Sequence, residues 1–247
     1  MSISWYAGVR KLARALVPLQ ARFTYSHPER VPRHGGVLLV SNHLGPTDPI
    51  FVGVRLGRQM RILAKAEIFE WPLLGWLAHR CGAVPIHRGE SDREALRIAL
   101  RLLADDQCVL VFPEGTYADP PEPPAMLPVK TGAAWLALKA GVPIVPVAVM
   151  GSERVWTLPR GWRIWHHPHV HLIFGEPYQP SVPPGVTMRQ ALHLVAEEMG
   201  YRIAALLPDA YRGRYRSAAP ADHAAPPDGY PSSDNAAIAA GALRPTP

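Results

Sequence analysis

GVLLVSNHLGPTDPIF, residues 36–51, contains the two features that decide the fold: an apolar run and a polar turn that follows it. The run 36–42 is typical of a buried strand. A Gly-Pro pair then favours a tight reversal, and Asp48 followed by Pro49 is typical of the N-cap and first position of a helix. The stretch therefore predicts a strand, a turn that carries His43, and a helix that starts beside Asp48.

Outward from this stretch, short apolar runs alternate with helical patterns. Further strands are predicted at 61–64, 83–86, 108–112, 143–150 and 169–174, and helices after Ser91, at 131–140 and at 188–207. This alternation predicts an α/β fold, a single-domain sandwich with a mostly parallel central sheet flanked by helices. We divide the chain into an amphipathic N-terminal helix within 1–25, the main domain at 26–216, and a disordered Ala/Pro-rich tail at 217–247.

The N-terminal segment has one apolar helical face, formed by Trp5, Val9, Leu12 and Leu16. Three basic residues, Arg10, Lys11 and Arg14, lie on its other faces. Such a helix suits the interface of an anionic bilayer. It suits equally a helix that docks on its own domain, and the pattern does not separate the two.

The composition limits the classes of function. A formal charge of +6 favours acidic partners such as nucleic acids, anionic lipid headgroups or phosphorylated substrates. The chain has 2 cysteines without CxxC spacing, which argues against a disulfide or a cysteine zinc site and fits a reducing cytosol. No signal-peptide pattern is present, and no apolar run reaches the roughly 18–20 residues of a membrane-spanning helix.

The turn after the first strand places His43 where open α/β sheets bind ligands, at the carboxyl end of a strand. If the turn brings Asp48 back to the imidazole, a carboxylate on one ring nitrogen raises the basicity of the other. This pairing suits a general base. The alternative is that Asp48 only caps the helix.

Three other stretches could carry chemistry. FPEGT (112–116) follows a buried strand, and Glu114 there either meets a ligand or satisfies a loop amide. GAVPIHRG (82–89) places Arg88 after a strand, either to bind phosphate or as an ordinary surface residue. AGVPIVPVAV (140–149) is either plain core or the wall of an acyl pocket.

In order along the chain, NHxxxxD, GxxPIxR, FPEGT and VPIVPVA resemble the motifs of the glycerolipid acyltransferase family, which includes bacterial 1-acylglycerol-3-phosphate acyltransferases. The resemblance runs from about Gly36 to Gly175. It implies transfer of a fatty acyl group from a CoA or acyl carrier protein thioester to the free hydroxyl of a lysophospholipid, in the simplest case 1-acylglycerol-3-phosphate giving phosphatidic acid. It further implies no metal or other cofactor, and a peripheral place on the cytoplasmic face of the cell membrane.

The resemblance also implies roles for single residues. His43 would be the general base and Asp48 would orient it. Lys65 and Arg88 would bind the phosphate of the acceptor. Glu114, Gly115 and Thr116 of FPEGT would bind its glycerol portion. Pro143 would help to shape the side of the site that binds the acyl chain. No GxSxG nucleophile elbow occurs, so we expect direct transfer without a covalent serine intermediate.

One position departs from the family pattern. Related enzymes commonly read FPEGTR, whereas Tyr117 follows Thr116 here. The loss of that arginine removes a fixed positive charge from the acceptor site. Either Arg88, Lys65 or Lys130 compensates, or the acceptor is another lysolipid.

Two rival functions would each need a residue pattern of their own. In HHPHVH (166–171), His167, His169 and His171 share one face of a strand, which would suit a metal-dependent hydrolase. A nucleic-acid adaptor would need a dense basic stripe with interleaved aromatic residues, which the chain lacks, so we expect no nucleic-acid partner.

Overall fold

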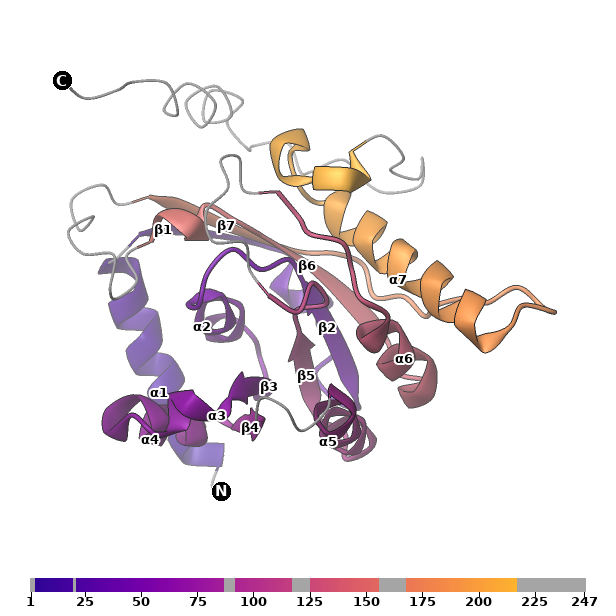
Figure 1. Cartoon of the computed structure of the whole chain (residues 1–247). Coiled ribbons are helices and arrows are strands. Elements are labelled where there is room, and N and C mark those ends of the chain that lie inside the picture. The colour runs from indigo at the N-terminus through magenta and orange to yellow at the C-terminus, as the bar shows by residue number, and fades with distance from the viewer. Residues whose placement is uncertain (1–2, 20, 87–91, 117–124, 156–167, 217–247) are drawn as a thin grey trace.

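The computed structural model describes residues 3–19, 21–86, 92–116, 125–155 and 168–216 of the 247-residue chain. Within these residues, seven strands form one sheet in the order β1-β7-β6-β2-β5-β3-β4 (Figure 1). The strands are β1 (Arg22–Ser26), β2 (Val37–Ser41), β3 (Met60–Lys65), β4 (Ala83–Ile86), β5 (Cys108–Val111), β6 (Ile144–Met150) and β7 (His169–Phe174).

Five strands of the sheet run in one direction, and β1 and β7 run in the other. Every neighbouring pair is parallel except β6 and β7, which are antiparallel. The amino ends of β1 and β7 therefore lie at the same edge as the carboxyl ends of the other five strands. The predicted α/β sandwich with a mostly parallel sheet is confirmed.

Helices cover both faces of the sheet (Figure 1). They are α1 (Ile3–Leu16), α2 (Asp48–Val54), α3 (Ala66–Phe69), α4 (Pro72–Cys81), α5 (Asp92–Ala104), α6 (Thr131–Ala140) and α7 (Met188–Ala204). The strand β2 shows why both faces are buried. Leu38 and Val40 pack with α5, α6 and α7, whereas Val37 and Leu39 pack on the side of α2. A strand covered on both faces reads as a continuous apolar run, as this one does.

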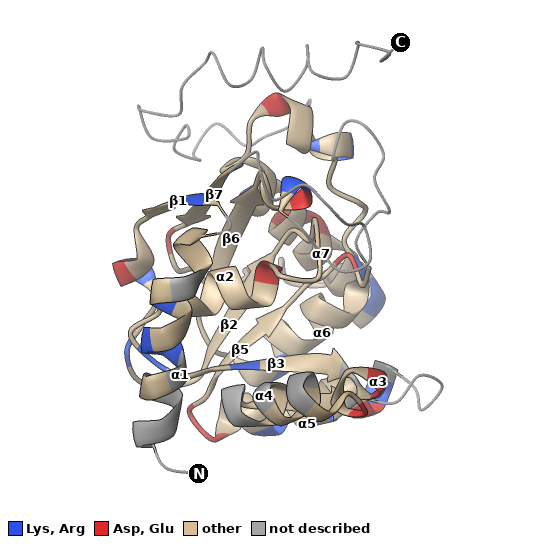
Figure 2. Ribbon diagram, turned by 90° about the vertical axis from the view of Figure 1, so that its left-hand side faces the viewer, with Lys and Arg blue, Asp and Glu red and all other residues tan. Residues whose placement is uncertain are grey.

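The N-terminal helix α1 lies beside α2 (Figure 2). Its basic residues tie it to the C-terminal end of that helix. Arg10 donates to the carbonyl oxygen of Leu56, and Arg14 donates to that of Val54 at 2.8 Å. These carbonyls lie at the C-terminal end of α2, where cations are favoured. Of the two placements that the sequence left open for this helix, the contacts of Arg10 and Arg14 are those of a helix docked on its own domain.

Two local differences from the predicted elements concern β1 and α2. The strand β1 was not predicted, because RFTYS contains no continuous apolar run. Its first four residues alternate between exposed and half-buried, as expected for the outermost strand of a sheet. The helix α2 starts at Asp48, one residue earlier than predicted, and its N-cap is Thr47, whose side chain makes no capping bond. The predicted tail 217–247 lies outside the described residues.

Candidate active site

The carboxyl ends of β2, β5 and β6 bring three loops together at one edge of the sheet. The loops are 42–47, 112–116 and 151–153, and each follows a strand of buried residues. Since β5 and β6 flank β2 on its two sides, the loop after β2 has a partner on each side. This arrangement is where ligands bind in open α/β sheets.

Asn42 fixes the start of the first loop. Its side-chain amide donates to the carbonyl oxygen of Val149 and accepts from the amide of Val149, both at 2.8 Å. This fully buried side chain replaces one rung of the ladder between β2 and β6. The backbone is therefore held rigidly just before His43.

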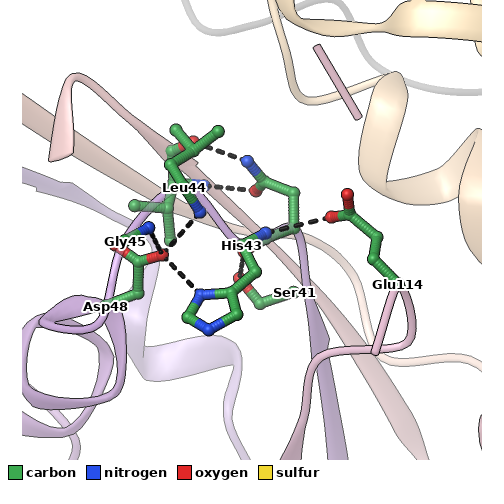
Figure 3. A network of polar contacts seen from close by, with 8 residues as sticks. Ser41, His43, Leu44, Gly45, Asp48 and Glu114 are labelled. Atoms are coloured by element: carbon green, nitrogen blue, oxygen red, sulfur yellow. Dashed lines mark hydrogen bonds and ion pairs between the residues drawn. The ribbon is translucent and has the colours of Figure 1, made fainter. Parts of the chain in front are cut away.

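The predicted pairing of His43 with Asp48 is present in the structure (Figure 3). The Nδ1 atom of His43 lies 2.8 Å from Oδ2 of Asp48. The same oxygen accepts the backbone amides of Leu44 at 2.7 Å and Gly45 at 2.9 Å. Asp48 is fully buried, so three donors on one oxygen offset the cost of burying its charge.

The pairing fixes which ring nitrogen can accept a proton. Because the carboxylate of Asp48 can only accept, Nδ1 of His43 donates and carries the ring proton. The lone pair then lies on Nε2, on the side of the ring away from Asp48. The side chain of His43 is 14% exposed, so this nitrogen belongs to a partly open site. The geometry is that of a general base with an orienting carboxylate.

Phe112 supports the imidazole from one side. Its ring stacks on that of His43 with centroids 3.9 Å apart and planes inclined by 17°. The prediction placed Phe112 in the preceding strand, whereas β5 ends at Val111. The stack restricts ring rotation and complements the hydrogen bond to Asp48.

Glu114 holds the backbone of the loop that carries His43. Its Oε1 accepts the backbone amide of His43 at 3.0 Å, and its Oε2 accepts the amide of Leu127 at 2.6 Å. Of the two interpretations that the sequence left open, satisfaction of loop amides is the one that these contacts show. Glu114 therefore ties together two loops that lie 13 and 71 residues from it along the chain.

The environment of Glu114 also changes its protonation. Only 3% of the residue is exposed. Burial raises the pKa of its carboxyl group to about 7, because the bonds from Leu127 and His43 only partly offset the lost solvation, and the charge of Asp48 adds to the rise. Glu114 thus titrates near neutral pH.

Gly115 and Lys130 form the rim next to Glu114. Gly115 has φ +72°, which favours glycine. A methyl group built on it would lie 2.6 Å from Nζ of Lys130, so the ammonium group packs directly over the glycine. The backbone amide of Lys130 is fixed by the carbonyl oxygen of Pro113 at 2.9 Å. A cation is thereby held at the rim of the site.

The other predicted substrate-binding residues fall in different places. Thr116 is exposed beside Gly115, and Lys65 ends β3 at the same sheet edge. Arg88 lies outside the described residues. Pro143 precedes β6, and its carbonyl oxygen accepts the amide of Leu38 at 3.0 Å.

Pro143 is therefore not brought together with His43. Leu38 is five residues before His43 in an extended strand, so the two positions are about 17 Å apart at roughly 3.3 Å per residue. Pro143 lies at the opposite edge of the sheet from the candidate site.

The histidines of the rival metal site have hydroxyl partners. The Nε2 atom of His169 lies 2.6 Å from Oγ1 of Thr24, and that of His171 lies 3.0 Å from Oγ of Ser26. No group of three or more residues suited to a metal ion occurs among the described residues, and His167 lies outside them. Burial raises the pKa of the Cys108 thiol to about 12, which fits a core residue rather than a nucleophile.

Two supporting residues, Asn42 and Phe112, were not predicted to take part in the site. Both adjoin the ends of buried strands, and a polar amide or an aromatic ring at that place is the signal that could have found them. Their roles depend on which strands are neighbours.

Comparisons with known proteins agree with the geometry. Residues 22–150 match the family model described as Acyltransferase. A chloroplast 1-acyl-sn-glycerol-3-phosphate acyltransferase of Brassica napus is 32% identical over 163 residues, which cover 65% of this chain and 45% of the relative. The chain thus spans less than half of that relative's length.

Two further similarities come from bacteria. A lyso-ornithine lipid O-acyltransferase of Pseudomonas aeruginosa is 35% identical over 139 residues, covering 55% of this chain and 49% of that protein. The crystal structure of a 1-acyl-sn-glycerophosphate acyltransferase from Thermotoga maritima superposes with a TM-score of 0.56 at 26% identity, covering 78% of this chain and 75% of that one.

Proposed function

Since this chain belongs to the acyltransferase family, we propose that it transfers a fatty acyl group from a CoA or acyl carrier protein thioester to the free hydroxyl of a lysophospholipid. The observation that carries the proposal is the bond between Nδ1 of His43 and Asp48 at the shared edge of β2, β5 and β6. It supplies the base that an alcohol nucleophile needs.

The proposed reaction follows from these contacts. Nε2 of His43 takes the proton of the acceptor hydroxyl, and the oxygen attacks the thioester carbonyl carbon. The new C–O bond forms, the C–S bond breaks, and the imidazolium returns the proton to the leaving thiolate. Asp48 stabilises the imidazolium between these two steps.

Glu114 acts in this scheme on the protein rather than on the substrate. Both of its oxygens accept loop amides, and one of these amides belongs to His43. It therefore fixes the backbone from which the base projects. The backbone amides of Leu44 and Gly45 likewise donate to Asp48, so they hold the carboxylate rather than a developing oxyanion.

For the anionic headgroup of the acceptor, the geometry favours Lys130. Its ammonium group packs over Gly115, two positions before Tyr117 in the motif. A single ammonium group binds phosphate as a point charge, unlike the bidentate fork of the arginine common in this family. The first acceptor to test is 1-acylglycerol-3-phosphate, the substrate for which the relatives from Brassica napus and Thermotoga maritima are named.

A second acceptor has its own support. The Pseudomonas aeruginosa relative is named for lyso-ornithine lipid, which has no phosphate. The replacement of the usual arginine by Tyr117 fits an acceptor with less negative charge.

The test is an acyl-transfer assay with the purified full chain. Acyl-CoA and acyl carrier protein thioesters are each combined with lysophosphatidate, lyso-ornithine lipid and neutral lysolipids, and the acylated product is quantified. We expect transfer to at least one acceptor and its loss in His43→Ala. Absence of transfer to every acceptor, or full activity of His43→Ala, would overturn the proposal.

We also propose that the protein acts peripherally on the cytoplasmic face of the cell membrane, where its lipid acceptor resides. None of the described helices has the length and apolarity needed to cross a bilayer. Three large apolar side chains are exposed on neighbouring helices: Leu12 of α1 (59%), Trp71 at the N-cap of α4 (63%) and Trp76 within α4 (46%). The helices α1 and α4 are in contact. Exposed tryptophan and leucine side chains suit a lipid interface.

The membrane proposal is tested without deleting α1, because Arg10 and Arg14 of that helix also cap α2. The substitutions Leu12→Glu and Trp71→Glu should weaken sedimentation with anionic vesicles while acyl transfer to a detergent-dispersed acceptor persists. The matched control is Leu194→Glu, at an exposed leucine of α7 on the other side of the sheet. Equal vesicle binding by all variants would contradict the proposed surface.

A further inference from the structure

The helix α5 carries three arginines on one face. Arg93, Arg97 and Arg101 follow one another at intervals of four residues, which places them in a row along the helix, and all three are exposed. We call this row the arginine stripe. At a rise of 1.5 Å per residue, the stripe is about 12 Å long. It therefore presents three positive charges to one partner surface.

The arginine stripe has no counter-charge within the described part of the chain. None of its guanidinium groups forms an ion pair with a described carboxylate. Glu94 lies in the first turn, where a carboxylate favours the N-terminus of a helix. Repulsion between like charges four residues apart weakens a helix. An anionic partner outside the chain therefore explains the stripe better than the stability of α5 does.

The opposite face of α5 anchors the helix in the core. Ala99 and Leu103 are buried there together with residues of α6 and α7. Leu38 and Val40 of β2 belong to the same cluster, whereas α2 packs on the other face of the sheet. The helix α5 thus lies across the sheet from α1 and α2 (Figure 1). The stripe is a fixed row of charges on the face that does not carry α1.

The arginine stripe leads toward the candidate site. The helix α5 joins the carboxyl end of β4, which lies at the site edge, to the amino end of β5 at the opposite edge. Arg93 is therefore nearer the site than Arg101. Leu96, between them, approaches the start of α6, because a methyl group built on Gly132 would lie 3.6 Å from its Cδ1 atom. Lys130, the cation at the rim of the site, is two residues before Gly132.

Three other partners of a basic surface fit the stripe less well. A bilayer interface needs large apolar side chains, and none of the exposed ones in the described chain belongs to α5. Nucleic acid favours aromatic residues between the basic ones, and the sequence of α5 contains none. Small anionic ligands such as CoA bind in concave sites, whereas the stripe lies on the outward face of a helix. An acidic protein surface is the partner that remains.

We propose that a carrier protein with an acidic surface delivers the acyl thioester and docks on the arginine stripe. The inference rests on the proposed function in that the carrier brings the thioester to His43. Of the two donors that the proposed function admits, it selects acyl carrier protein. It also assigns one face of the sheet to each substrate. The lipid acceptor arrives from the side of α1, and the acyl donor arrives from the side of α5.

The test compares the two donors with the purified full chain. Acyl transfer is measured at varied concentrations of acyl carrier protein thioester or acyl-CoA, with saturating acceptor. In Arg97→Glu, at the middle of the stripe, we expect kcat/KM for the carrier to fall about tenfold through KM, because the reversed charge opposes docking. Arg93→Glu combined with Arg97→Glu should lower it further. For acyl-CoA, kcat/KM should stay within about twofold of wild type in both variants.

The matched control is Arg189→Glu, which reverses an exposed arginine of α7 outside the stripe. It should leave kcat/KM unchanged with both donors. Arg97→Lys keeps the charge and should keep most of the activity with the carrier. Added salt should lower kcat/KM for the carrier in wild type, and this dependence should be weaker in Arg97→Glu. If Arg97→Glu does not fold, the neutral Arg97→Gln replaces it in the same comparison.

Direct binding separates this inference from the proposed function. Fluorescently labelled acyl carrier protein should bind wild type and Arg189→Glu, and bind Arg97→Glu more weakly, whether or not acyl transfer occurs. Transfer from acyl-CoA without any binding of the carrier would overturn the inference and leave the proposed function standing. An equal loss with both donors in Arg97→Glu would overturn it too. So would unchanged carrier binding with weaker sedimentation on phosphatidylglycerol vesicles, which would make the stripe a membrane contact.

Discussion

Two regions at one edge of the sheet carry histidines, and they differ in what the imidazoles contact. In the turn after β2, Nδ1 of His43 meets the carboxylate of Asp48 at 2.8 Å. On β7, His169 and His171 stack with centroids 6.3 Å apart, and each contacts a hydroxyl of β1. A carboxylate stabilises the protonated imidazole, whereas a hydroxyl adds no charge.

The difference shows why a histidine's partner matters more than its position. Burial lowers the pKa of His171 to about 4, with a smaller contribution from His169. His171 therefore stays neutral through the physiological range and serves the packing of β1 on β7. His43 has the charged partner and the partial exposure that a base needs.

The largest effect is expected from removal of the imidazoles themselves. His43→Gln should lower kcat for acyl transfer about 10²–10⁴-fold, the usual contribution of a general base. His171→Gln, which keeps a hydrogen-bonding group for Ser26, should leave kcat within about twofold. The measurement is the initial rate with saturating acceptor. A comparable loss in both variants would end the distinction between the two regions.

The second effect concerns the carboxylate that distinguishes them. Asp48→Asn keeps the shape but removes the charge, and its amide can donate to Nδ1 of His43 and so favour the wrong tautomer. We expect a fall in kcat of at least about 10²-fold with a smaller change in KM. The control is Ser26→Ala, which removes the corresponding partner of His171 and should leave kcat unchanged. A wild-type kcat in folded Asp48→Asn would exclude the orienting role.

The sequence was sufficient to predict the strand, turn and helix that carry this site, but not the hydrogen bonds that join distant parts of the chain around it. The strand before His43 and the pairing with Asp48 were predictable, because an apolar run and a residue five positions away are local features. The bond from the His43 amide to Glu114 joins residues 71 apart, and that from Tyr211 to Glu153 joins residues 58 apart. Such contacts depend on strand order and on packing of the C-terminal segment, which no local pattern encodes.

The edge strand β1 was missed for a related reason. Phe23 and Tyr25 turn toward the core, while Arg22 and Thr24 are exposed, so the apolar signal is too short to stand out. The hydroxyl partners of the β7 histidines lie on this strand. The metal-site hypothesis concerned the histidines of β7. It could be tested only when the structure showed that β1 pairs with β7 and supplies their hydroxyl partners.

The third effect is a pH dependence of stability that originates at Glu114. Its pKa is about 7 in the folded state against 4.5 in the unfolded chain, so the folded state binds the extra proton between these values. Its contribution to the free energy of unfolding is full below pH 4.5 and falls by about 3 kcal/mol as pH rises to 7. Glu114→Gln, which imitates the protonated acid, should remove this fall.

Urea unfolding at pH 5, 6 and 7.5 measures the change for Glu114. The free energy of unfolding of Glu114→Gln should increase with pH relative to that of wild type over this range. Glu176→Gln, at an exposed glutamate on the surface, is the control and should run parallel to wild type. Parallel curves for Glu114→Gln as well would mean that Glu114 titrates normally.

The smallest effect comes from His171 and has the opposite sign. Its pKa is lowered from 6.5 to about 4, so the unfolded chain binds the extra proton between these values. The stability that this group contributes is full above pH 6.5 and is lost as pH falls to 4, by about 1–2 kcal/mol after allowance for solvent screening. As pH rises from 4.5 to 6.5 in wild type, the stability gained from His171 partly cancels the stability lost from Glu114. The same urea series on His171→Gln should therefore show a steeper decline of stability with rising pH than wild type. A decline equal to that of wild type would show that the pKa of His171 is the same in the folded and the unfolded chain, and would contradict the lowered value.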